Sequence, residues 1–418
     1  MLIRLLITTL FFTYSTSTTA NTKTASLYAD AAQSVYQIRV INKETGKKSS
    51  IGSGFVVAKN NILATNYHVV SQYVNNPDTY VLEYLSNTKE TGRLELLDLD
   101  IVHDLAVVKA PKAMGKILNI DAIPEKGARL FSLGNPLDLG FSIVEGTNNG
   151  ILKQDEDGNI YFSGSLNAGM SGGPTLNEAG KVIGINVATA GNNISFLVPA
   201  DYLKIVLQRL QKNNYAPIED RFAHSSAQIR TSSTKILSKL ANNDWGQASI
   251  GHFIVPAELD KSVHCWDASL QPKKDDLFRS FHTRCSNEDN IFLSDQLSMG
   301  SINYEYLWLD SDKLNPARFY RYYETHNNSA LASNAGKRDV TNFACYTAFT
   351  KIAEQHFKTT LCRRDYIKYK NLSDILFTTA LVDHKDKGFI FNMDITGADA
   401  NAATHLFKKM LEAFKWRK

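Results

Sequence analysis

The chain has 418 residues, which is enough for two domains that each bury a core of their own. Its composition is that of an ordinary globular protein, with 43% hydrophobic and 21% charged residues and no low-complexity tract. The net charge of +4 is small and spread along the chain, so it gives no support for a nucleic-acid partner.

The N-terminus has the layout of a secretory signal peptide. Arg4 precedes an apolar run at residues 5–12, and a small polar stretch then leads to Ala20. This order predicts a signal peptide over residues 1–20. The run is far shorter than the roughly 20 apolar residues that cross a bilayer, and we expect no transmembrane segment in the mature chain. A short uncleaved anchor is the alternative; we expect an exported protein, periplasmic rather than fully extracellular.

The first half of the chain reads as a series of short strands. Brief β-branched runs alternate with Gly, Asn and Asp turns up to residue 198, which indicates an all-β sandwich or barrel. The clearest runs are 35–40, 54–57, 80–85, 105–109, 130–133, 182–187 and 195–198. After Pro199, apolar residues recur at helical spacing and predict an amphipathic helix.

The second half mixes strand and helix patterns. Residues 213–235 include a Ser/Thr-rich stretch and resemble a connector. Alternation at 302–308 fits a strand, 375–382 and 389–395 flank a turn as in a hairpin, and the chain closes on an amphipathic helix. We therefore expect a first domain over 24–212, a linker over 213–235 and an α+β domain over 236–418.

All four cysteines lie in the second half: Cys265, Cys285, Cys345 and Cys362. An even count in an exported protein predicts disulfides. The two local pairings close the shortest loops, although three connectivities are open. A metal site is the alternative, because His264 adjoins one cysteine and His282 precedes another by three residues. The paired spacings typical of zinc sites are missing, so we expect no metal.

A glycine-rich turn at residues 169–174 suggests a nucleophile. It reads Gly-Met-Ser-Gly-Gly-Pro, with the serine at position 171. Amide hydrolysis needs a nucleophile beside backbone N–H groups that stabilise the developing oxyanion. The turn supplies both, through the Ser171 hydroxyl and the N–H groups of Gly169 and Ser171. Taken alone, the pattern is as consistent with an ordinary β turn.

Two further residues complete a catalytic set. His68 follows an apolar strand and is a candidate base for the serine, which is unreactive without one. Asp104 stands at the start of the strand at 105–108 and is a candidate partner that orients the histidine. Asp98 and Asp100 are nearby competitors that we rank below it. The order His, Asp, Ser is that of chymotrypsin-like enzymes, and the Gly-x-Ser-x-Gly elbow of esterases is missing.

These segments, with Gly-Asn-Pro at 134–136 and the run at 180–186, resemble the HtrA/Deg branch of trypsin-like serine proteases over about residues 30–212. The resemblance implies a double six-stranded β-barrel with the site in the cleft and no cofactor. It makes His68 the general base, Asp104 its orienting partner, Ser171 the nucleophile and Gly169 the second oxyanion donor. Met170 departs from the Asn or Asp usual there, and no PDZ-like segment follows.

The same resemblance suggests a specificity pocket. Its floor lies six residues before the nucleophile and its walls come from the strands that follow: Ser165, Val187, Ala188, Thr189 and Ser195. No acidic residue occupies the floor, so we expect a preference for small or medium apolar side chains at P1.

The sequence therefore predicts a serine endopeptidase that cleaves exported proteins or peptides through an acyl-enzyme. The alternative is a protease-fold binding or sensor protein whose second domain recognises a partner. Aromatic residues at 304–308 and 319–323 offer a binding groove to substrate or partner, although core packing explains them at least as well.

Overall fold

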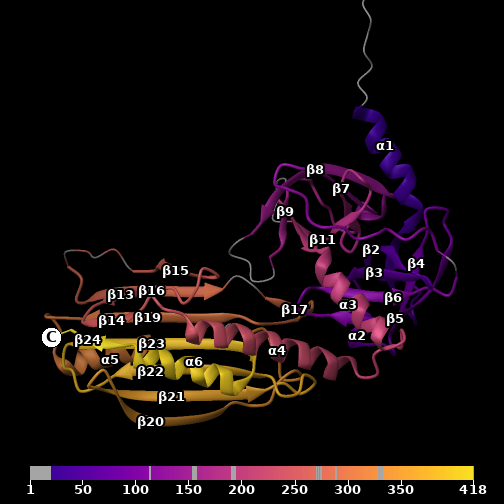
Figure 1. Cartoon of the computed structure of the whole chain (residues 1–418). Coiled ribbons are helices and arrows are strands. Elements are labelled where there is room, and N and C mark those ends of the chain that lie inside the picture. Colours follow the sequence, from indigo (N-terminus) through magenta and orange to yellow (C-terminus); the bar gives the residue numbers. More distant parts are fainter. Residues whose placement is uncertain are drawn as a thin grey trace, which may run out of the picture.

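The computed structural model describes residues 20–112, 114–152, 158–189, 194–269, 271, 273, 275–287, 290–327, 331 and 333–417. The predicted signal peptide, 1–20, lies outside these ranges except for its last residue. Helix α1 (Ala20–Ala31) and the short 3-10 turn η1 (Ala32–Ser34) lead into a pair of barrels, and a large sheet lies beside them (Figure 1). Within the described ranges no helix is long and apolar enough to cross a membrane.

The first six strands close into an antiparallel barrel in the order β1-β2-β3-β6-β5-β4. They are β1 (Val35–Asn42), β2 (Lys48–Ala58), β3 (Ile62–Asn66), β4 (Tyr80–Leu85), β5 (Thr91–Asp100) and β6 (Leu105–Lys109). Helix α2 (Tyr67–Asn75) follows β3 directly. Asn66 at the end of β3 pairs with Leu105 at the start of β6, so the residues just beyond these two positions lie together at one end of the barrel.

A second antiparallel barrel follows, in the order β10-β11-β12-β9-β8-β7. Its strands are β7 (Arg129–Gly134), β8 (Ser142–Ile151), β9 (Ile160–Phe162), β10 (Pro174–Leu176), β11 (Val182–Thr189) and β12 (Ser195–Pro199), with a 3-10 turn η2 (Pro136–Asp138) after β7. The predicted double six-stranded barrel is confirmed. The expected helix after Pro199 is α3 (Ala200–Lys212), and that proline is its N-cap.

The second half is built on one antiparallel sheet in the order β15-β16-β19-β23-β22-β21-β20. Its strands are β15 (Val263–Asp267), β16 (Arg279–Asn287), β19 (Ile302–Asp310), β20 (Ala344–Ile352), β21 (Gln355–Asp365), β22 (Ser373–Leu381) and β23 (Lys387–Ala398). Smaller elements are β13 (Gln247–Ile250), β14 (Phe253–Pro256), β24 (Lys415–Trp416), the hairpin β17 (Ile291–Ser294) and β18 (Leu297–Met299), and α5 (Pro316–His326). The α+β expectation holds, including the strand at 302–308 and the hairpin β22–β23.

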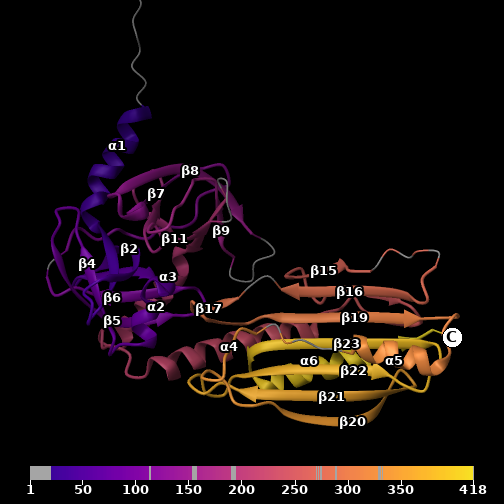
Figure 2. The ribbon, with the colours of Figure 1, turned by 180° about the vertical axis from the view of Figure 1, so that it is seen from behind.

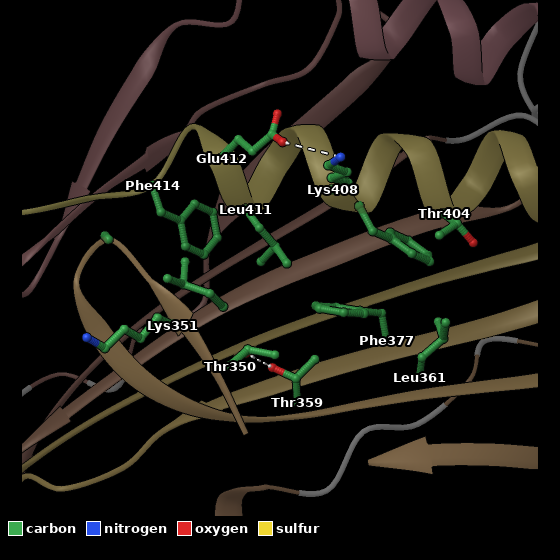
Figure 3. Close-up of a pocket in the computed structure, with 13 residues that line it drawn as sticks. Thr350, Lys351, Thr359, Leu361, Phe377, Thr404, Lys408, Leu411, Glu412 and Phe414 are labelled. Carbon is green, nitrogen blue, oxygen red and sulfur yellow. Dashed lines mark hydrogen bonds and ion pairs between the residues drawn. The ribbon is translucent and has the colours of Figure 1, made fainter. Parts of the chain in front are cut away.

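The aromatic residues of this region pack its core. Tyr304, Tyr306 and Trp308 are at most 2% exposed, and Phe319 is fully buried. Helix α6 (Ala400–Glu412) covers β22 and β23 and leaves a groove of about 530 Å³ against β20 and β21 (Figure 3). Core packing therefore accounts for most of the aromatic cluster.

The stretch predicted as a linker is largely helical. Helix α4 (Arg221–Asn242) begins inside it and runs from the barrels along the sheet (Figure 1). The side chain of Asp220 caps it by accepting hydrogen bonds from two backbone N–H groups. The Ser/Thr content is compatible with helix because hydroxyls return to the preceding turn, as Ser226 Oγ does to Phe222 O at 2.7 Å.

The cysteines form the two local disulfides, Cys265–Cys285 and Cys345–Cys362. Each bridges residues that face each other on adjacent strands, β15–β16 and β20–β21. The cysteines beside His264 and His282 are thus paired, and disulfide sulfurs are not available as thiolate ligands.

One of the hydrophobic cores contains residues from both halves of the chain. Strand β17 lies beside α2 (Figures 1 and 2). Buried side chains of the β17–β18 hairpin and of the segment before β22 belong to the same hydrophobic core as the first barrel. Leu293 is fully buried there among barrel residues that include Tyr67 and Val70. The second half contributes the following buried residues to this core: Ile229, Leu293, Leu297, Met299, Val340, Tyr366, Tyr369 and Leu372. The first barrel thus depends on the second half for part of its interior.

We expect Leu293→Ala to weaken the first barrel as well as the hairpin. Loss of a fully buried leucine side chain costs about 2–5 kcal/mol, and here the cavity opens between the two halves. Hydrogen exchange should show faster opening of α2 and β3, which lie more than 200 residues away in sequence. Leu277→Ala, at a side chain that is 54% exposed, is the control. Exchange that rises only in residues 243–417 would contradict a shared core.

Candidate active site

His68 and Asp104 meet where β3 and β6 end together. Asp104 immediately precedes β6, and His68 is the second residue of α2. Nδ1 of His68 lies 2.6 Å from Oδ2 of Asp104, and the His68 backbone N–H donates to Oδ1 at 2.8 Å. A carboxylate only accepts, so the ring proton sits on Nδ1 and leaves Nε2 free to take another.

The backbone of Asp104 is held as firmly as its side chain. Its carbonyl accepts from the Tyr67 N–H at 3.0 Å and from Nδ2 of Asn66 at 2.8 Å. Its φ of 54° lies in the left-handed region, which aspartate tolerates better than most residues. These contacts fix the carboxylate against the imidazole and hold the strained backbone in place.

The structure places the two competing aspartates elsewhere. Asp98 is buried and pairs with Arg209 at 2.8 Å and with His224 at 3.0 Å. Asp100 lies 2.7 Å from Nδ1 of His103. Among the described hydrogen bonds and ion pairs of these three aspartates, only those of Asp104 involve His68.

Burial and charge act in opposite directions on His68. Burial disfavours the protonated ring, but the charge and hydrogen bond of Asp104, with a contribution from Asp295, more than offset it. The pKa of His68 is therefore raised above its ordinary value of 6.5.

Ser171 sits in a turn whose shape requires glycine. Gly172 has a φ of +83°, and a Cβ there would lie 2.3 Å from the carbonyl oxygen of Ser53. The turn is tied to the first barrel by the Ser53 N–H, which donates to Ser171 O at 2.7 Å. Ser53 Oγ donates to Gly169 O at the same distance. The glycines thus let the serine loop pack against β2 of the first barrel.

The carbonyls of the two peptide groups that end at Gly169 and Ser171 are hydrogen-bonded within the protein. Ala168 O accepts from the Leu137 N–H at 2.8 Å, and Met170 O accepts from the Gly173 N–H at 3.0 Å. The N–H of a trans peptide points away from its carbonyl, so the N–H groups of Gly169 and Ser171 each point away from these hydrogen-bonded carbonyls. Within the described part of the chain, neither of these N–H groups donates to a protein acceptor.

Met170 is an apolar residue of the second barrel. Its side chain is fully buried among Leu130, Ile160, Phe162, Leu166, Ile183 and Leu197. An Asn or Asp would leave a polar group in this core, so the departure at this position follows from packing. The backbone of Met170 still takes part in the turn, because its N–H donates to Asn167 O and its carbonyl accepts from the Gly173 N–H.

The hydroxyl of Ser171 donates to the carbonyl oxygen of Val187 at 3.0 Å. This hydrogen bond turns the hydroxyl toward β11, whereas the hydrogen bonds of the His68 ring run to Asp104. Val187 also lines the cavity beside His68 and Asp104, but the described hydrogen bonds do not join Ser171 to the His–Asp pair.

A cavity of about 510 Å³ opens beside His68 and Asp104. Val187 from the second barrel and Phe292 and Asp295 from the β17–β18 hairpin also line it. Sequence reasoning missed these two hairpin residues, because they lie more than 120 positions after Ser171 and carry no motif. Only the folded arrangement brings them to the cleft.

The expected specificity-pocket residues fall in two groups. Ser165 is exposed and Val187 partly buried, whereas Ser195 is fully buried, with its Oγ donating to Gly164 O at 2.8 Å. This hydrogen bond fixes the position of Gly164, the residue before Ser165. Ala188 and Thr189 lie in β11, and their side chains are outside the described set.

Residues 52–185 match the family described as the trypsin-like peptidase domain. The mitochondrial serine protease HTRA2 of Drosophila grimshawi is 29% identical over 171 residues, which is 38% of this chain and 39% of that protein. The HTRA2 of Drosophila virilis is also 29% identical, over 38% of this chain and 40% of its own length. The chain thus spans about two fifths of the length of these relatives.

Two solved structures are similar at lower identity. The serine endoprotease from Yersinia pestis is 22% identical with a TM-score of 0.40 and matches 46% of this chain and 67% of its own. Deg5 is 23% identical with a TM-score of 0.42, over 47% of this chain and 97% of its own. None of these matches identifies the second half. The first half of the chain is therefore similar to the trypsin-like peptidase domain, over residues 52–185, and to the HtrA serine proteases.

Proposed function

We propose that this protein is a serine endopeptidase in which His68, Asp104 and Ser171 form the catalytic triad. The observation that carries the proposal is the hydrogen-bonded pair of His68 and Asp104, with the ring nitrogen 2.6 Å from the carboxylate, in a trypsin-like peptidase domain. The proposed protease region spans 24–212, followed by the connector 213–235 and the region 236–418, with the signal peptide at 1–20.

In the proposed reaction, Ser171 attacks the scissile carbonyl while Nε2 of His68 accepts the hydroxyl proton. Asp104 keeps the imidazole in the required tautomer and stabilises the imidazolium. The N–H groups of Gly169 and Ser171 receive the oxyanion, and the imidazolium then protonates the leaving amine. Water completes the cycle by hydrolysing the acyl-enzyme. No step in this scheme requires a cofactor.

The hydroxyl of Ser171 must first leave Val187. A rotation about the Cα–Cβ bond exchanges the hydrogen bond to the Val187 carbonyl for one to His68. Catalytic hydrogen bonds are often poorly aligned without substrate and tighten in the Michaelis complex. This arrangement is also the observation that favours the second candidate, a protease-fold binding protein whose catalysis is latent.

The proposed substrates are exported proteins or peptides with a small or medium apolar P1 residue. Ser165, Val187, Ala188, Thr189 and Ser195 are the proposed specificity pocket, and none of them is acidic. Two disulfides support a location in an oxidising compartment, and we propose the periplasm.

A fluorophosphonate probe tests the proposed nucleophile. We expect the full-length mature protein to be labelled, with casein cleavage to match, because the probe reacts only with an activated serine. Ser171→Ala should abolish labelling and His68→Ala should reduce it strongly, whereas Ser249→Ala, at an exposed serine of β13, should leave it unchanged. Asp104→Asn should lower kcat by about 10⁴-fold, since the tautomer is lost.

Labelling that persists in Ser171→Ala would rule out Ser171 as the nucleophile. A folded wild-type protein that neither labels nor cleaves would favour the latent binding protein instead. The folded state is checked by circular dichroism, and the full chain is used throughout because the two halves share a core.

The pH dependence tests the pairing of His68 with Asp104. Only the neutral imidazole accepts the serine proton, so activity is lost as pH falls through the pKa of His68. Because that pKa is raised, the acid limb of kcat/KM should have its midpoint above 6.5. A pH series with a peptide substrate that has no ionisable side chain measures it. A midpoint at or below 6.5 would contradict the proposed electrostatics.

A further inference from the structure

The hairpin β17–β18 is anchored to the element that carries His68. The Tyr67 hydroxyl donates to Leu293 O at 2.8 Å, and Nδ2 of Asn75 donates to the same oxygen at 3.0 Å. Both donors belong to α2, and the Tyr67 side chain is fully buried. The hairpin therefore has a fixed position relative to the imidazole, although it comes from the second half of the chain.

Phe292 places an apolar surface against the imidazole. Its ring meets the His68 ring edge to face, with centroids 6.3 Å apart. Phe292 is only partly buried and lines the cavity of about 510 Å³ that also exposes Asp104 and Val187. The hairpin thus borders the imidazole, and the cavity beside them has room for a ligand.

Asp295 adds a negative charge to the same cavity. It lies exposed at the tip of the hairpin, where Nε2 of Gln72 donates to it at 3.3 Å. The other charged groups of the lining are engaged: Asp104 by His68, and His103 by Asp100. No lysine or arginine is among the described residues that line this cavity. The site therefore combines an apolar wall with an unneutralised carboxylate.

Lysine and arginine side chains match these two features. Their aliphatic stems pack on apolar surfaces while their charged ends remain in contact with water or a carboxylate. A general base stands between the nucleophile and the leaving group, so a subsite beside the imidazole holds a residue next to P1 in the substrate.

We infer that the β17–β18 hairpin is a wall of the substrate-binding cleft, where Phe292 and Asp295 select a lysine or arginine at a position flanking P1. The inference rests on the proposed protease function and deepens it. It makes the second half of the chain a determinant of specificity at the active site.

The test uses the full-length protein and peptides with P1 held as valine. P2 and P1′ are each varied between lysine and its neutral analogue norleucine. In wild type, kcat/KM should favour lysine at one of these positions. Asp295→Asn should reduce this lysine-to-norleucine ratio about fivefold, the upper end for an exposed ion pair. Asp312→Asn, at another exposed aspartate of the second half, is the matched control and should leave the ratio unchanged.

Phe292→Ala tests the apolar wall separately. It should lower kcat/KM for lysine and norleucine peptides by similar factors, because both stems lose the same contact. Phe292→Leu should restore part of the loss. If Phe292→Ala instead raises activity on every peptide, the hairpin is a cover that blocks the cleft, and the inference is wrong.

The remaining outcomes separate the two proposals. A protein that labels at Ser171 and cleaves, but shows equal lysine-to-norleucine ratios in wild type and Asp295→Asn, overturns the inference and leaves the protease function standing. A folded protein that neither labels nor cleaves overturns the protease function and the inference with it.

Discussion

The contact between Asp104 and His68 is the constraint on which the proposed chemistry depends. It exists because β3 pairs with β6, so that the residue before β6 and the first turn of α2 meet at one end of the barrel. Asp104 contacts the first turn of α2 in two ways. Its carboxylate accepts a hydrogen bond from the His68 ring, and its backbone carbonyl accepts one from the Tyr67 N–H. A change that slips the β3–β6 register would move the side chain and the backbone partner together.

The second half of the chain is joined to the first barrel by packing as well as by α4. Leu293, Leu297 and Met299 fill space beside α2, and the Tyr67 hydroxyl, buried with no access to water, finds its acceptor in Leu293 O. Without the hairpin, that hydroxyl would lose the Leu293 carbonyl as an acceptor, and buried side chains of the first barrel would be exposed. The second half therefore contributes part of the interior of the first barrel.

The double barrel could be predicted from the sequence, because brief apolar runs and turn residues give a signal within a short window. Disulfides were also expected, although the sequence left their connectivity open and the structure shows the two local pairs. Asp104 was separable from Asp98 and Asp100 by its place at a strand start, and the structure agrees in the hydrogen bonds it makes. The helix over 221–242 was missed because its Ser/Thr content is typical of connectors, while the hydroxyls in fact bond to the preceding turn. Phe292 and Asp295 had no local signal, since their role depends on a contact between residues far apart in sequence.

The hydrogen bond of Ser171 and the position of the hairpin both affect how the proposed triad is aligned. A hydroxyl has one proton, so Ser171 cannot donate to His68 while it donates to Val187. Any substrate group that takes the Val187 carbonyl removes the competitor and favours the orientation toward the imidazole. The hairpin borders the imidazole, and Phe292 limits where the His68 ring can move. In the proposed mechanism, a correctly placed substrate therefore aligns the Ser171 hydroxyl with a base that is already in position. The only conformational change that this alignment requires is rotation of the Ser171 side chain about its Cα–Cβ bond.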